Sequence, residues 1–569
     1  MSVWLPQRLS WRLPRLALPA RPTLSAEALL AMASLYFVVA CNQVFWRTLA
    51  GHHASPGLMA SLFVAVFALH ALLLGLVATR HLLKPMLGVL LVATACATFY
   101  MSRYAVLFDV GMIENILQTD LTETRELLSA GLMLHVAVFG VLPALLLATV
   151  RIRPRIWRTG IAARGMFLLA MAALAGIAIA MSSQGIFAVM RSDHALRYRI
   201  TPGNYIVSTV RALTQTPEPP PGQRQIVAAD AHVVRAPGHT PRLLVLVVGE
   251  TARAANWGLN GYARQTTPKL AARDIVNFGN VQACGTSTEV SLPCMFSPFG
   301  RAQYDREAIL THESLLDVLA RSGVAVQWRD NQSGCKGVCD GVGIQRMGPA
   351  DAPALCNGDR CFDDILLSGL QARIDATPGD LLVVLHQLGN HGPNYFERYP
   401  EADARFQRTC RTPELSRCSA AEIVNAYDNA LLYTDAFLSR ALDLVQAQQS
   451  HDAALLYVSD HGESLGEYGL FLHGAPYAIA PQQQLHVPMV AWVSSALAAD
   501  TGLDLRCLRD TADAPLSHDH LFDSVLGLFE VRTAAYRPGR DLFSPCRNVA
   551  GRAPSPTLRP AGRRRRLRP

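Results

Sequence analysis

The sequence predicts two unlike parts: an N-terminal membrane domain of five helices, and a following α/β domain built on a central, mainly parallel sheet. The first observation is a series of long uncharged runs between residue 25 and about residue 190. The second is an alternation of short apolar runs, polar turns and helical stretches in the remainder. The third is length, because 569 residues exceed what one hydrophobic core usually organises.

Five segments are long enough to cross the hydrocarbon core of a bilayer, which takes roughly 20 apolar residues in a helix. They lie at about residues 27–47, 57–79, 85–102, 130–150 and 165–188. A cleaved signal peptide fits poorly, since the first run is too long and further runs follow it. Residues 1–190 are therefore expected to form the membrane domain.

Basic residues indicate the orientation of these segments. They gather before the first segment, between the second and third, and between the fourth and fifth, which predicts that these stretches are cytoplasmic. They are Arg8, Arg12, Arg15 and Arg21, then Arg80 and Lys84, then Arg151, Arg153, Arg155, Arg158 and Arg164. Because the number of spans is odd, we expect an inner-membrane protein whose remainder lies in the periplasm.

Cysteine usage supports an oxidising compartment, because ten of the twelve cysteines lie beyond residue 280. Eight of them form couples that are close in sequence, which is typical of disulfides. The couples are Cys284 with Cys294, Cys335 with Cys339, Cys356 with Cys361, and Cys410 with Cys418, and by elimination Cys507 with Cys546 would make a fifth. Zinc–thiolate sites are the alternative, but the paired CxxC pattern and adjoining histidines of structural zinc sites are missing.

Residues 191–222 connect the two parts. Residues 191–216 mix apolar and basic positions, as an amphipathic helix on a membrane face does. The run PEPPPG at 217–222 is expected to be a stiff linker. The soluble domain then covers residues 223–548. The basic tail, 549–569, is expected to be disordered and solvated, with contact to lipid headgroups as the alternative.

Three apolar runs of the soluble domain are typical of strands buried on both faces of a sheet: RLLVLVVGE, GDLLVVLHQLGNHGP and AALLYVSDHGES. Acids or histidines follow them, namely Glu250, His391, Asp460 and His461. Ligands of open α/β sheets gather beyond the carboxyl ends of strands, and carboxylates together with imidazoles suit zinc. A single Asp-His pair is more often a capped turn, but several such strand ends favour a metal site.

A candidate nucleophile lies in the stretch QACGTSTEVSLPCMFS, which offers hydroxyls at Thr286, Ser287, Thr288 and Ser291. An alcohol needs a base or a metal to become a good nucleophile, and a neighbouring zinc would supply this activation. The pattern does not choose among the four hydroxyls. The alternative is that they only cap the helix that follows.

Five separated motifs resemble the lipid A phosphoethanolamine transferases, a family that includes the mobile colistin-resistance enzymes. The motifs are GETARAANWGLNGYARQTTP, CGTSTEVSLPCMFS, WRDNQSGCKGVCD, LHQLGNHGPNYFERYP and YVSDHGESLGEYG with FLHGAPY. The likeness also covers the five spans and the linker. It implies an alkaline phosphatase/sulfatase-like fold for the soluble domain.

The resemblance also implies residue roles. Thr288 would be the nucleophile that becomes phosphoethanolaminylated. The metal ligands of one tightly bound Zn²⁺ would be Glu250, Asp460, His461 and the oxygen of Thr288, and a second metal would bind during part of the cycle. Contacts to the phosphate or the leaving group would come from Lys336, His391 and His473. The disulfide between Cys335 and Cys339, which only some relatives share, would hold the lysine loop rigidly.

Two further sets of residues are predicted to contact substrate. In WRDNQS, where some relatives have asparagine, this chain has Gln332 after Asn331, and which of the two reaches the phosphate is open. In MIENILQTDLTETREL, the residues Asn115, Thr119 and Glu123 are four apart and are expected on one helical face. The resemblance suggests that they line the approach of the phosphatidylethanolamine headgroup, whose ammonium suits Glu123. A solvated polar stripe is the alternative.

The reaction implied has two displacements, from phosphatidylethanolamine to Thr288 and from Thr288 to lipid A. The added ethanolamine cation would weaken the binding of polymyxins to the outer surface. We expect a monomer without a nucleic-acid partner. A sulfatase would need a C/S-x-P-x-R motif, which is missing around Thr288. A transporter would place ionisable residues in its spans, whereas the predicted spans hold almost none. An inactive scaffold would lack some of the expected ligands, whereas every expected position is filled.

Overall fold

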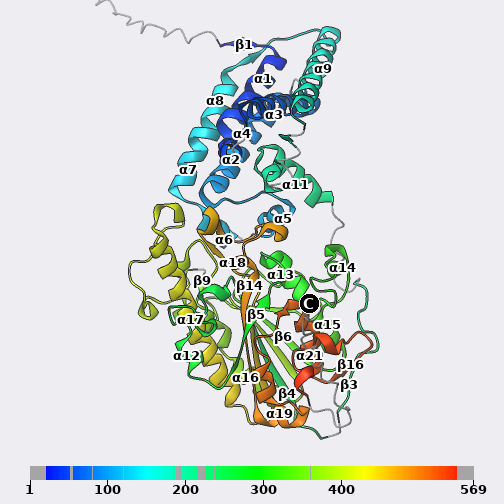
Figure 1. Ribbon diagram of the computed structural model, residues 1–569, viewed down its shortest axis with the longest axis vertical. Coiled ribbons are helices and arrows are strands. Elements are labelled where there is room, and N and C mark those ends of the chain that lie inside the picture. The colour runs from blue at the N-terminus through cyan, green and yellow to red at the C-terminus, as the bar shows by residue number, and fades with distance from the viewer. Residues whose placement is uncertain are drawn as a thin grey trace, which may run out of the picture. The chain divides into compact units, whose positions relative to one another are not determined.

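The computed structural model describes residues 21–51, 55–79, 81–119, 121–183, 185–186, 189, 194–214, 224–235, 238–358 and 360–547. The predicted linker at 217–222 and the predicted basic tail at 549–569 lie outside these residues. The chain forms two compact units (Figure 1). The first comprises Met1–Ser102 and Ala130–Val207, and the second comprises Arg103–Ser129 and Ser208–Pro569. The segment between the third and fourth predicted spans therefore belongs with the soluble domain.

The first unit contains the apolar helices that the sequence predicts. Four of the described helical segments are long and apolar enough to cross a membrane, and a bent pair makes a fifth if it counts as one span. The four are α3 (Pro56–Val77), α4 (Leu83–Tyr104), the segment Ala130–Thr149 that contains α7 (Ala130–Val136) and α8 (Leu142–Thr149), and α9 (Trp157–Met181). The bent pair is Ala26–Cys41, which begins with α1 (Ala26–Tyr36), and α2 (Gln43–Gly51).

The bend of 55° in the first span lies at Asn42. Asn42 Nδ2 donates to the carbonyls of Phe37, at 2.9 Å, and Thr201, at 2.7 Å. Its Oδ1 accepts from the backbone N–H of Thr201 at 2.9 Å, and Thr201 Oγ1 donates to the carbonyl of Cys41 at 2.9 Å. These side-chain bonds replace bonds of the helical ladder, which is a recognised cause of kinks.

The fifth predicted span differs from the observed helix. We expected residues 165–188, whereas α9 begins at Trp157 and ends at Met181. Hydropathy placed the start too late because Arg164 interrupts the apolar run. Its Nη1 donates to the carbonyls of Gly75 and Ala78, both at 2.8 Å, so the charge is accommodated at the end of α3.

The predicted amphipathic segment is helical where it is described. A 3₁₀ helix covers His194–Arg199, and α11 covers Gly203–Thr214. Four apolar side chains of α11 are exposed, namely Ile206, Val207, Val210 and Leu213. An exposed apolar stripe is what a helix on a membrane face requires, and the membrane placement of α11 stays a prediction.

The second unit is built on an eight-stranded sheet in the order β15-β5-β14-β11-β4-β10-β6-β7. Strands β11, β4, β10, β6 and β7 pair in parallel, while β14 is antiparallel to both of its neighbours. Their bounds are β4 Arg242–Gly249, β5 Val276–Gln282, β6 Ala325–Asp330, β7 Ile344–Arg346, β10 Leu381–His386, β11 Asp452–Ser459, β14 His486–Val493 and β15 Leu516–Ser517. The mainly parallel sheet of the prediction is confirmed.

Helices cover both faces of this sheet (Figure 1). Every residue of β4 is buried, as a central strand of a covered sheet must be. Alternate β4 side chains pack in the main hydrophobic core with α15 (Leu315–Arg321) and α21 (Leu521–Leu528). The opposite layer contains α17 (Ala420–Gln446) and α12 (Pro268–Ala271), which contact one another. The sheet therefore lies between two layers of helices.

Ends of the central parallel strands lie in register at one edge of the sheet. Gly249 of β4 pairs with Ser459 of β11, and His386 of β10 pairs with Val248 of β4 and with Asp330 of β6. The residues that follow these strands must therefore lie close together. This edge carries the candidate site.

Five disulfides stabilise the second unit. They join the pairs that the cysteine spacing indicates: Cys284 with Cys294, Cys335 with Cys339, Cys356 with Cys361, Cys410 with Cys418, and Cys507 with Cys546. The last pair spans 39 residues of sequence and connects α20 (Leu505–Asp510) to the end of the described chain. The two remaining cysteines, Cys41 and Cys96, are free and belong to the first unit.

Candidate active site

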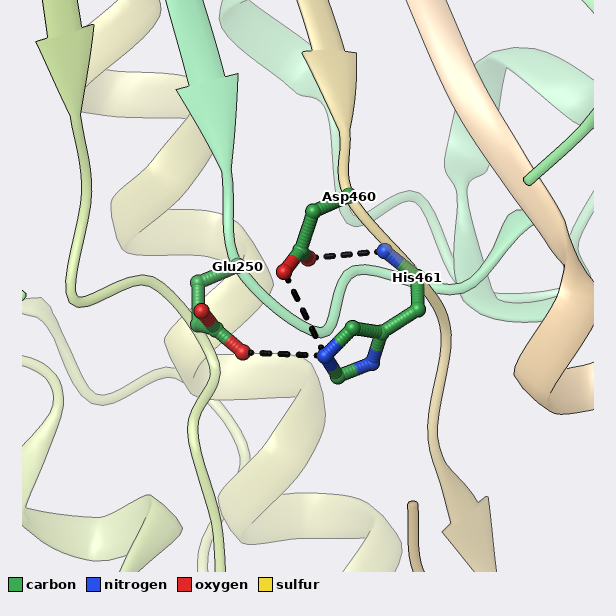
Figure 2. Close-up of side chains that lie close together, drawn as sticks. All are labelled: Glu250, Asp460 and His461. Carbon is green, nitrogen blue, oxygen red and sulfur yellow. Dashed lines mark hydrogen bonds and ion pairs between the residues drawn. The ribbon is translucent and has the colours of Figure 1, made fainter. Parts of the chain in front are cut away.

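Three side chains converge beyond the ends of β4 and β11 (Figure 2). Glu250 follows β4, and Asp460 and His461 follow β11. One ligand atom of each lies within 4.8 Å of the others, and all three residues are fully buried. His461 Nε2 lies 3.4 Å from Glu250 Oε1 and 3.3 Å from Asp460 Oδ2. The structure thus brings together Glu250, Asp460 and His461, three of the four residues that the strand ends indicated, in an arrangement that could hold a metal ion.

The electrostatics of this triad suit a bound cation. Glu250 Oε1 and Asp460 Oδ2 are buried and form no conventional hydrogen bond among the described residues. Burial, together with the Glu250 carboxylate, raises the pKa of Asp460 well above its ordinary value. Burial lowers the pKa of His461 to about 3, which keeps the imidazole neutral as a metal ligand must be. Two buried acids that repel one another are unfavourable alone and become favourable around a divalent metal.

Backbone contacts orient the triad. His461 Nδ1 lies 2.9 Å from the carbonyl of Gly462 and donates to it, so the unprotonated Nε2 faces the two acids. Asp460 Oδ1 accepts from the N–H groups of Thr251, at 3.2 Å, and His461, at 2.7 Å. Thr251 has a φ of 52°, a left-handed conformation that is rare for a β-branched residue. This strained turn after β4 aims the N–H of Thr251 at Asp460.

The hydroxyl that faces the triad belongs to Thr288. Its Oγ1 lies 3.0 Å from Glu250 Oε2 and 3.4 Å from His461 Nε2. The other candidates differ: Thr286 Oγ1 donates to the carbonyl of Ala475 at 2.7 Å, and Ser291 Oγ donates to the carbonyl of Asp460. Ser287 is the N-cap residue of the following helix, without a side-chain cap bond. Geometry thus separates four hydroxyls that the sequence left equivalent.

Thr288 is also the first residue of α13 (Thr288–Met295). A helix N-terminus carries a partial positive charge and unpaired N–H groups, which favour a phosphoryl group on this side chain. The disulfide between Cys284 and Cys294 joins the preceding loop to the end of the same helix. Both features hold the hydroxyl at the sheet edge.

His473 lies beside the triad and is oriented by an acid. Its ring centroid is 4.5 Å from that of His461. His473 Nδ1 lies 3.0 Å from Glu463 Oε2, and the hydroxyl of Tyr395 donates to Glu463 Oε1 at 2.8 Å. Because Nδ1 donates to the fully buried Glu463, Nε2 of His473 is the nitrogen that can exchange a proton with substrate. Sequence analysis missed Glu463, although it stands two residues after His461 in the quoted motif.

His391 pairs with an acid from the segment after α4. His391 Nε2 lies 3.3 Å from Glu123 Oε1. Burial by itself lowers the pKa of His391, but Glu123 outweighs it and raises this pKa to about 9. The two histidines are neighbours as well, since the ring centroids of His391 and His473 lie 5.3 Å apart. The structure therefore places Glu123 at the same site as the residues from the strand ends.

The predicted helical face of Asn115, Thr119 and Glu123 is wrong in one respect. Two helices replace the single one: α5 (Val110–Gln118) ends before Thr119, which is its C-cap residue, and α6 (Leu121–Leu127) carries Glu123. The backbone of Thr119 is extended, and its hydroxyl donates to the carbonyl of Asn115 at 2.7 Å, which satisfies the helix end. Asn115 still lies near the site, with its Nδ2 3.6 Å from where a Cβ on Gly474 would lie.

The two amides after β6 turn in different directions. Gln332 Nε2 donates to Glu250 Oε2 at 2.8 Å. Asn331 Nδ2 instead donates to Asp363 Oδ1, at 2.9 Å, and to the carbonyl of Cys361, at 3.0 Å. Gln332 is thus the amide at the triad, whereas Asn331 supports the neighbouring loop. Lys336 follows in the same loop.

A second acid of α6 was not foreseen. The carboxylate of Glu126 accepts hydrogen bonds from both terminal nitrogens of the buried Arg398, and the distance from Arg398 Nη1 to Glu126 Oε1 is 3.3 Å. Arg360 Nε donates to the same oxygen at 2.9 Å. Arg398 Nε also donates to the carbonyl of His391 at 2.7 Å. Burial alone would raise the pKa of Glu126, but the nearby positive charges, that of Arg398 foremost, together outweigh burial. The pKa therefore lies below its ordinary value, and the acid is ionised. Arg398 therefore ties α6 to the loop of His391.

We expect Glu126→Gln to weaken donor binding more than chemistry. Loss of the carboxylate leaves the guanidinium of Arg398 buried and unpaired, and α6 no longer holds Glu123 against His391. The KM for the donor that the sequence motifs imply should rise on the order of tenfold, with a smaller change in kcat. Steady-state kinetics of donor cleavage by the purified full chain measure both constants.

Glu401→Gln is the matched control, because Glu401 pairs with Arg411 at the surface. An exposed pair contributes little, so this variant should keep both constants. Glu126→Asp should recover part of the donor affinity. If Glu126→Gln lowered kcat alone, or lowered stability without changing KM, the positioning role would be wrong.

Two family models match the chain. The model described as phosphoethanolamine transferase EptA/EptB matches residues 66–216, and the Sulfatase model matches residues 242–531. The chain is 35% identical over 545 residues to phosphoethanolamine transferase EptA of Escherichia coli (strain K12), covering 93% of this chain and 98% of the relative. It is 36% identical over 527 residues to phosphatidylethanolamine transferase Mcr-1 of Escherichia coli, covering 90% and 96%.

A solved structure matches nearly the whole chain. The integral membrane protein lipooligosaccharide phosphoethanolamine transferase A (EptA) from Neisseria meningitidis superposes with a TM-score of 0.89 at 36% identity, covering 93% of this chain and 100% of that chain. Its soluble domain, solved alone, matches at 46% identity with a TM-score of 0.56, covering 57% of this chain and 99% of that chain. These matches confirm the predicted fold class, apolar helices followed by a sulfatase-like domain.

Proposed function

The chain belongs to the phosphoethanolamine transferase EptA/EptB family and is a phosphoethanolamine transferase, and we propose that it uses phosphatidylethanolamine as donor and lipid A as acceptor. The observation that carries the proposal is the Thr288 hydroxyl, 3.0 Å from Glu250 within a buried Glu–Asp–His triad. This arrangement supports a covalent phosphoethanolamine–threonine intermediate. Names of relatives support the acceptor, because one is a Kdo(2)-lipid A phosphoethanolamine 7''-transferase of Escherichia coli.

Zinc is the metal that the donor set fits best. Two carboxylates and one neutral imidazole leave a fourth position open, which is typical of a catalytic zinc site. Glu250, Asp460 and His461 would hold the ion, and Thr288 would complete the set. When bound, zinc would lower the pKa of the hydroxyl and polarise the phosphoryl oxygens.

In the first displacement, Thr288 Oγ1 forms a bond to phosphorus, and the bond from phosphorus to the diacylglycerol oxygen breaks. Thr288 Oγ1 gives its proton to Glu250 Oε2, to which it donates at 3.0 Å, and the diacylglycerol oxygen takes up a proton as it leaves. We assign the second proton transfer to Nε2 of His473, because Glu463 holds the opposite nitrogen. Glu123 would pair with the ammonium of the headgroup, and Lys336 would pair with its phosphate.

In the second displacement, a phosphate oxygen of the acceptor forms the new bond to phosphorus. The bond to Thr288 Oγ1 breaks, and the hydroxyl regains its proton. The product carries an added ammonium, which lowers the net negative charge of the outer surface. We therefore propose that the enzyme reduces susceptibility to polymyxins. The basic stretches and the disulfides support an inner-membrane location with a periplasmic active site.

Mass spectrometry of lipid A tests the donor group and acceptor together. A susceptible Gram-negative host that expresses the full chain should contain lipid A with added phosphoethanolamine, and the same host with an empty vector should not. If the purified protein cleaves phosphatidylethanolamine while lipid A stays unchanged, lipid A is the wrong acceptor. The search would then move to other glycans of the envelope.

A further inference from the structure

The loop after β6 lines a cavity of about 460 Å³ outside the triad. Its lining includes Ser333, Lys336 and Arg346, together with Gln118 at the end of α5. We call it the lysine-loop pocket. The disulfide between Cys335 and Cys339 closes the loop beside Lys336. All these residues belong to the second unit.

The backbone of this loop offers unused hydrogen-bond donors. Gly334, Lys336 and Gly337 have φ values of 98°, 49° and 84°. A left-handed φ is uncommon for lysine and marks a conformation that its surroundings impose. Residues 336–340 form a turn, and successive N–H groups of a turn can form an anion-binding concavity. Among the described residues, no acceptor is recorded for the N–H groups of Cys335, Lys336 and Gly337.

The side chains of the pocket add positive charge. Arg346 is exposed and has no ion pair or side-chain hydrogen bond within the described part of the chain, whereas Lys336 interacts electrostatically with Glu123. The carboxylate in the lining, Asp340, is paired with Arg224 at 3.0 Å. Arg346 Nη2 lies 3.6 Å from where a Cβ on Gly334 would lie, so the guanidinium lies beside the start of this loop. The guanidinium of Arg346 and the three N–H groups suit a phosphate group.

The pocket adjoins the reacting threonine through two short connections. Gln118 Nε2 donates at 2.7 Å to Glu289 Oε1, and Glu289 directly follows Thr288. Ser333 of the lining directly follows Gln332, whose Nε2 donates to Glu250 at 2.8 Å. A group bound in the pocket would therefore lie beside the phosphorylated threonine.

We propose that the lysine-loop pocket binds the phosphate monoester of the acceptor and that Arg346 determines acceptor affinity. This inference rests on the proposed two-step transfer and adds a second subsite to it. The acceptor phosphate would pair with Arg346 and the loop N–H groups, and one of its oxygens would attack the phosphorus on Thr288. The donor, in contrast, would be held by Glu123 and His391.

The test separates the two half-reactions in the purified full chain. Arg346→Glu and Arg346→Gln are each mixed with phosphatidylethanolamine, and mass spectrometry follows phosphoethanolamine on Thr288. Diphosphoryl lipid A is then added, and discharge of the label is timed. Labelling should proceed at the rate of the unmodified chain, whereas the lipid A concentration for half-maximal discharge should rise at least roughly tenfold for Arg346→Glu. Arg346→Lys should recover part of this loss.

Arg373→Glu is the matched control. Arg373 is an exposed arginine of α16 (Leu370–Asp375), which precedes the start of β10, whereas the candidate site lies beyond the ends of the parallel strands. It should change neither step. Slower labelling in Arg346→Glu would assign the pocket to the donor phosphate and overturn the inference, as would unchanged discharge.

Binding of diphosphoryl lipid A to the Thr288→Ala chain, in which no transfer occurs, tests the pocket independently of transfer. The added Arg346→Glu change should raise the Kd at least roughly tenfold. An unchanged Kd overturns the inference whatever the transfer assay gives. Failure of the unmodified chain to become labelled would instead contradict the proposed function, while the binding result still decides on the pocket.

Discussion

Thr288→Ala should abolish both the covalent intermediate and the transfer of phosphoethanolamine. The hydroxyl at 3.0 Å from Glu250 is the group that forms the bond to phosphorus, and alanine offers no oxygen in its place. Removal of the nucleophile from a group of residues that act together in covalent catalysis typically lowers the rate at least roughly 10⁴-fold. The measurement is mass spectrometry of the purified chain after incubation with phosphatidylethanolamine, together with lipid A from cells that express the variant.

Two further variants distinguish a lost nucleophile from a disturbed loop. Thr288→Ser retains a hydroxyl and should become labelled, at a reduced rate because serine lacks the methyl group that restricts the side-chain rotamer. Thr286 lies in the same loop as Thr288, and its hydroxyl donates to the carbonyl of Ala475. The Thr286→Ala chain should still become labelled. Label on the Thr288→Ala chain would assign the nucleophile to another residue.

The strand-end motifs predicted the triad well for a physical reason. Apolar runs that are buried on both faces identify parallel strands, and parallel strands end at one edge, so Glu250, Asp460 and His461 had to meet. The choice of Thr288 required more than this reasoning. Composition left four hydroxyls open, and the contact of Thr288 with Glu250 appears once α13 has been placed against the strands.

Contacts between distant segments were beyond the sequence patterns. The pairing of Glu126 with Arg398 joins residues 272 apart in sequence, and hydropathy or periodicity carries no information about it. The break between α5 and α6 was missed because a spacing of four fits a helix equally well on both sides of Thr119. A short acidic helix with two glutamates three residues apart was the available signal for Glu126, and it did not identify a partner.

The predicted spans succeeded where composition is decisive and failed where a polar side chain finds a local partner. Asn42 and Arg164 both lie in apolar surroundings, and each bonds to backbone carbonyls of the same unit. The predicted span 27–47 runs through Asn42 without the bend, and the span predicted from residue 165 excludes Arg164, whereas the fold bends one helix at Asn42 and keeps Arg164 inside another. Their effect depends on the neighbouring helix, which a window does not contain.

Asp460→Asn should remove the metal and with it the activity. The substitution takes away one of two buried carboxylates while asparagine can still accept from the N–H groups of Thr251 and His461. Zinc content by elemental mass spectrometry should fall to background, and transfer should be lost. In the unmodified chain, removal of zinc by a chelator should lower the thermal unfolding temperature by on the order of 10 °C, and added zinc should restore it.

The Asp460→Asn chain should show no response to the chelator, because it has no bound metal to lose. Without metal it should even unfold at a higher temperature than the metal-free unmodified chain, since the repulsion that raises the pKa of Asp460 is relieved. Asp380→Asn is the control: Asp380 accepts from the N–H of Arg242 at 2.8 Å, at the opposite end of β4. That variant should lose stability and still respond to zinc, whereas an Asp460→Asn chain that binds zinc and responds to the chelator would contradict the assignment of Asp460 as a ligand.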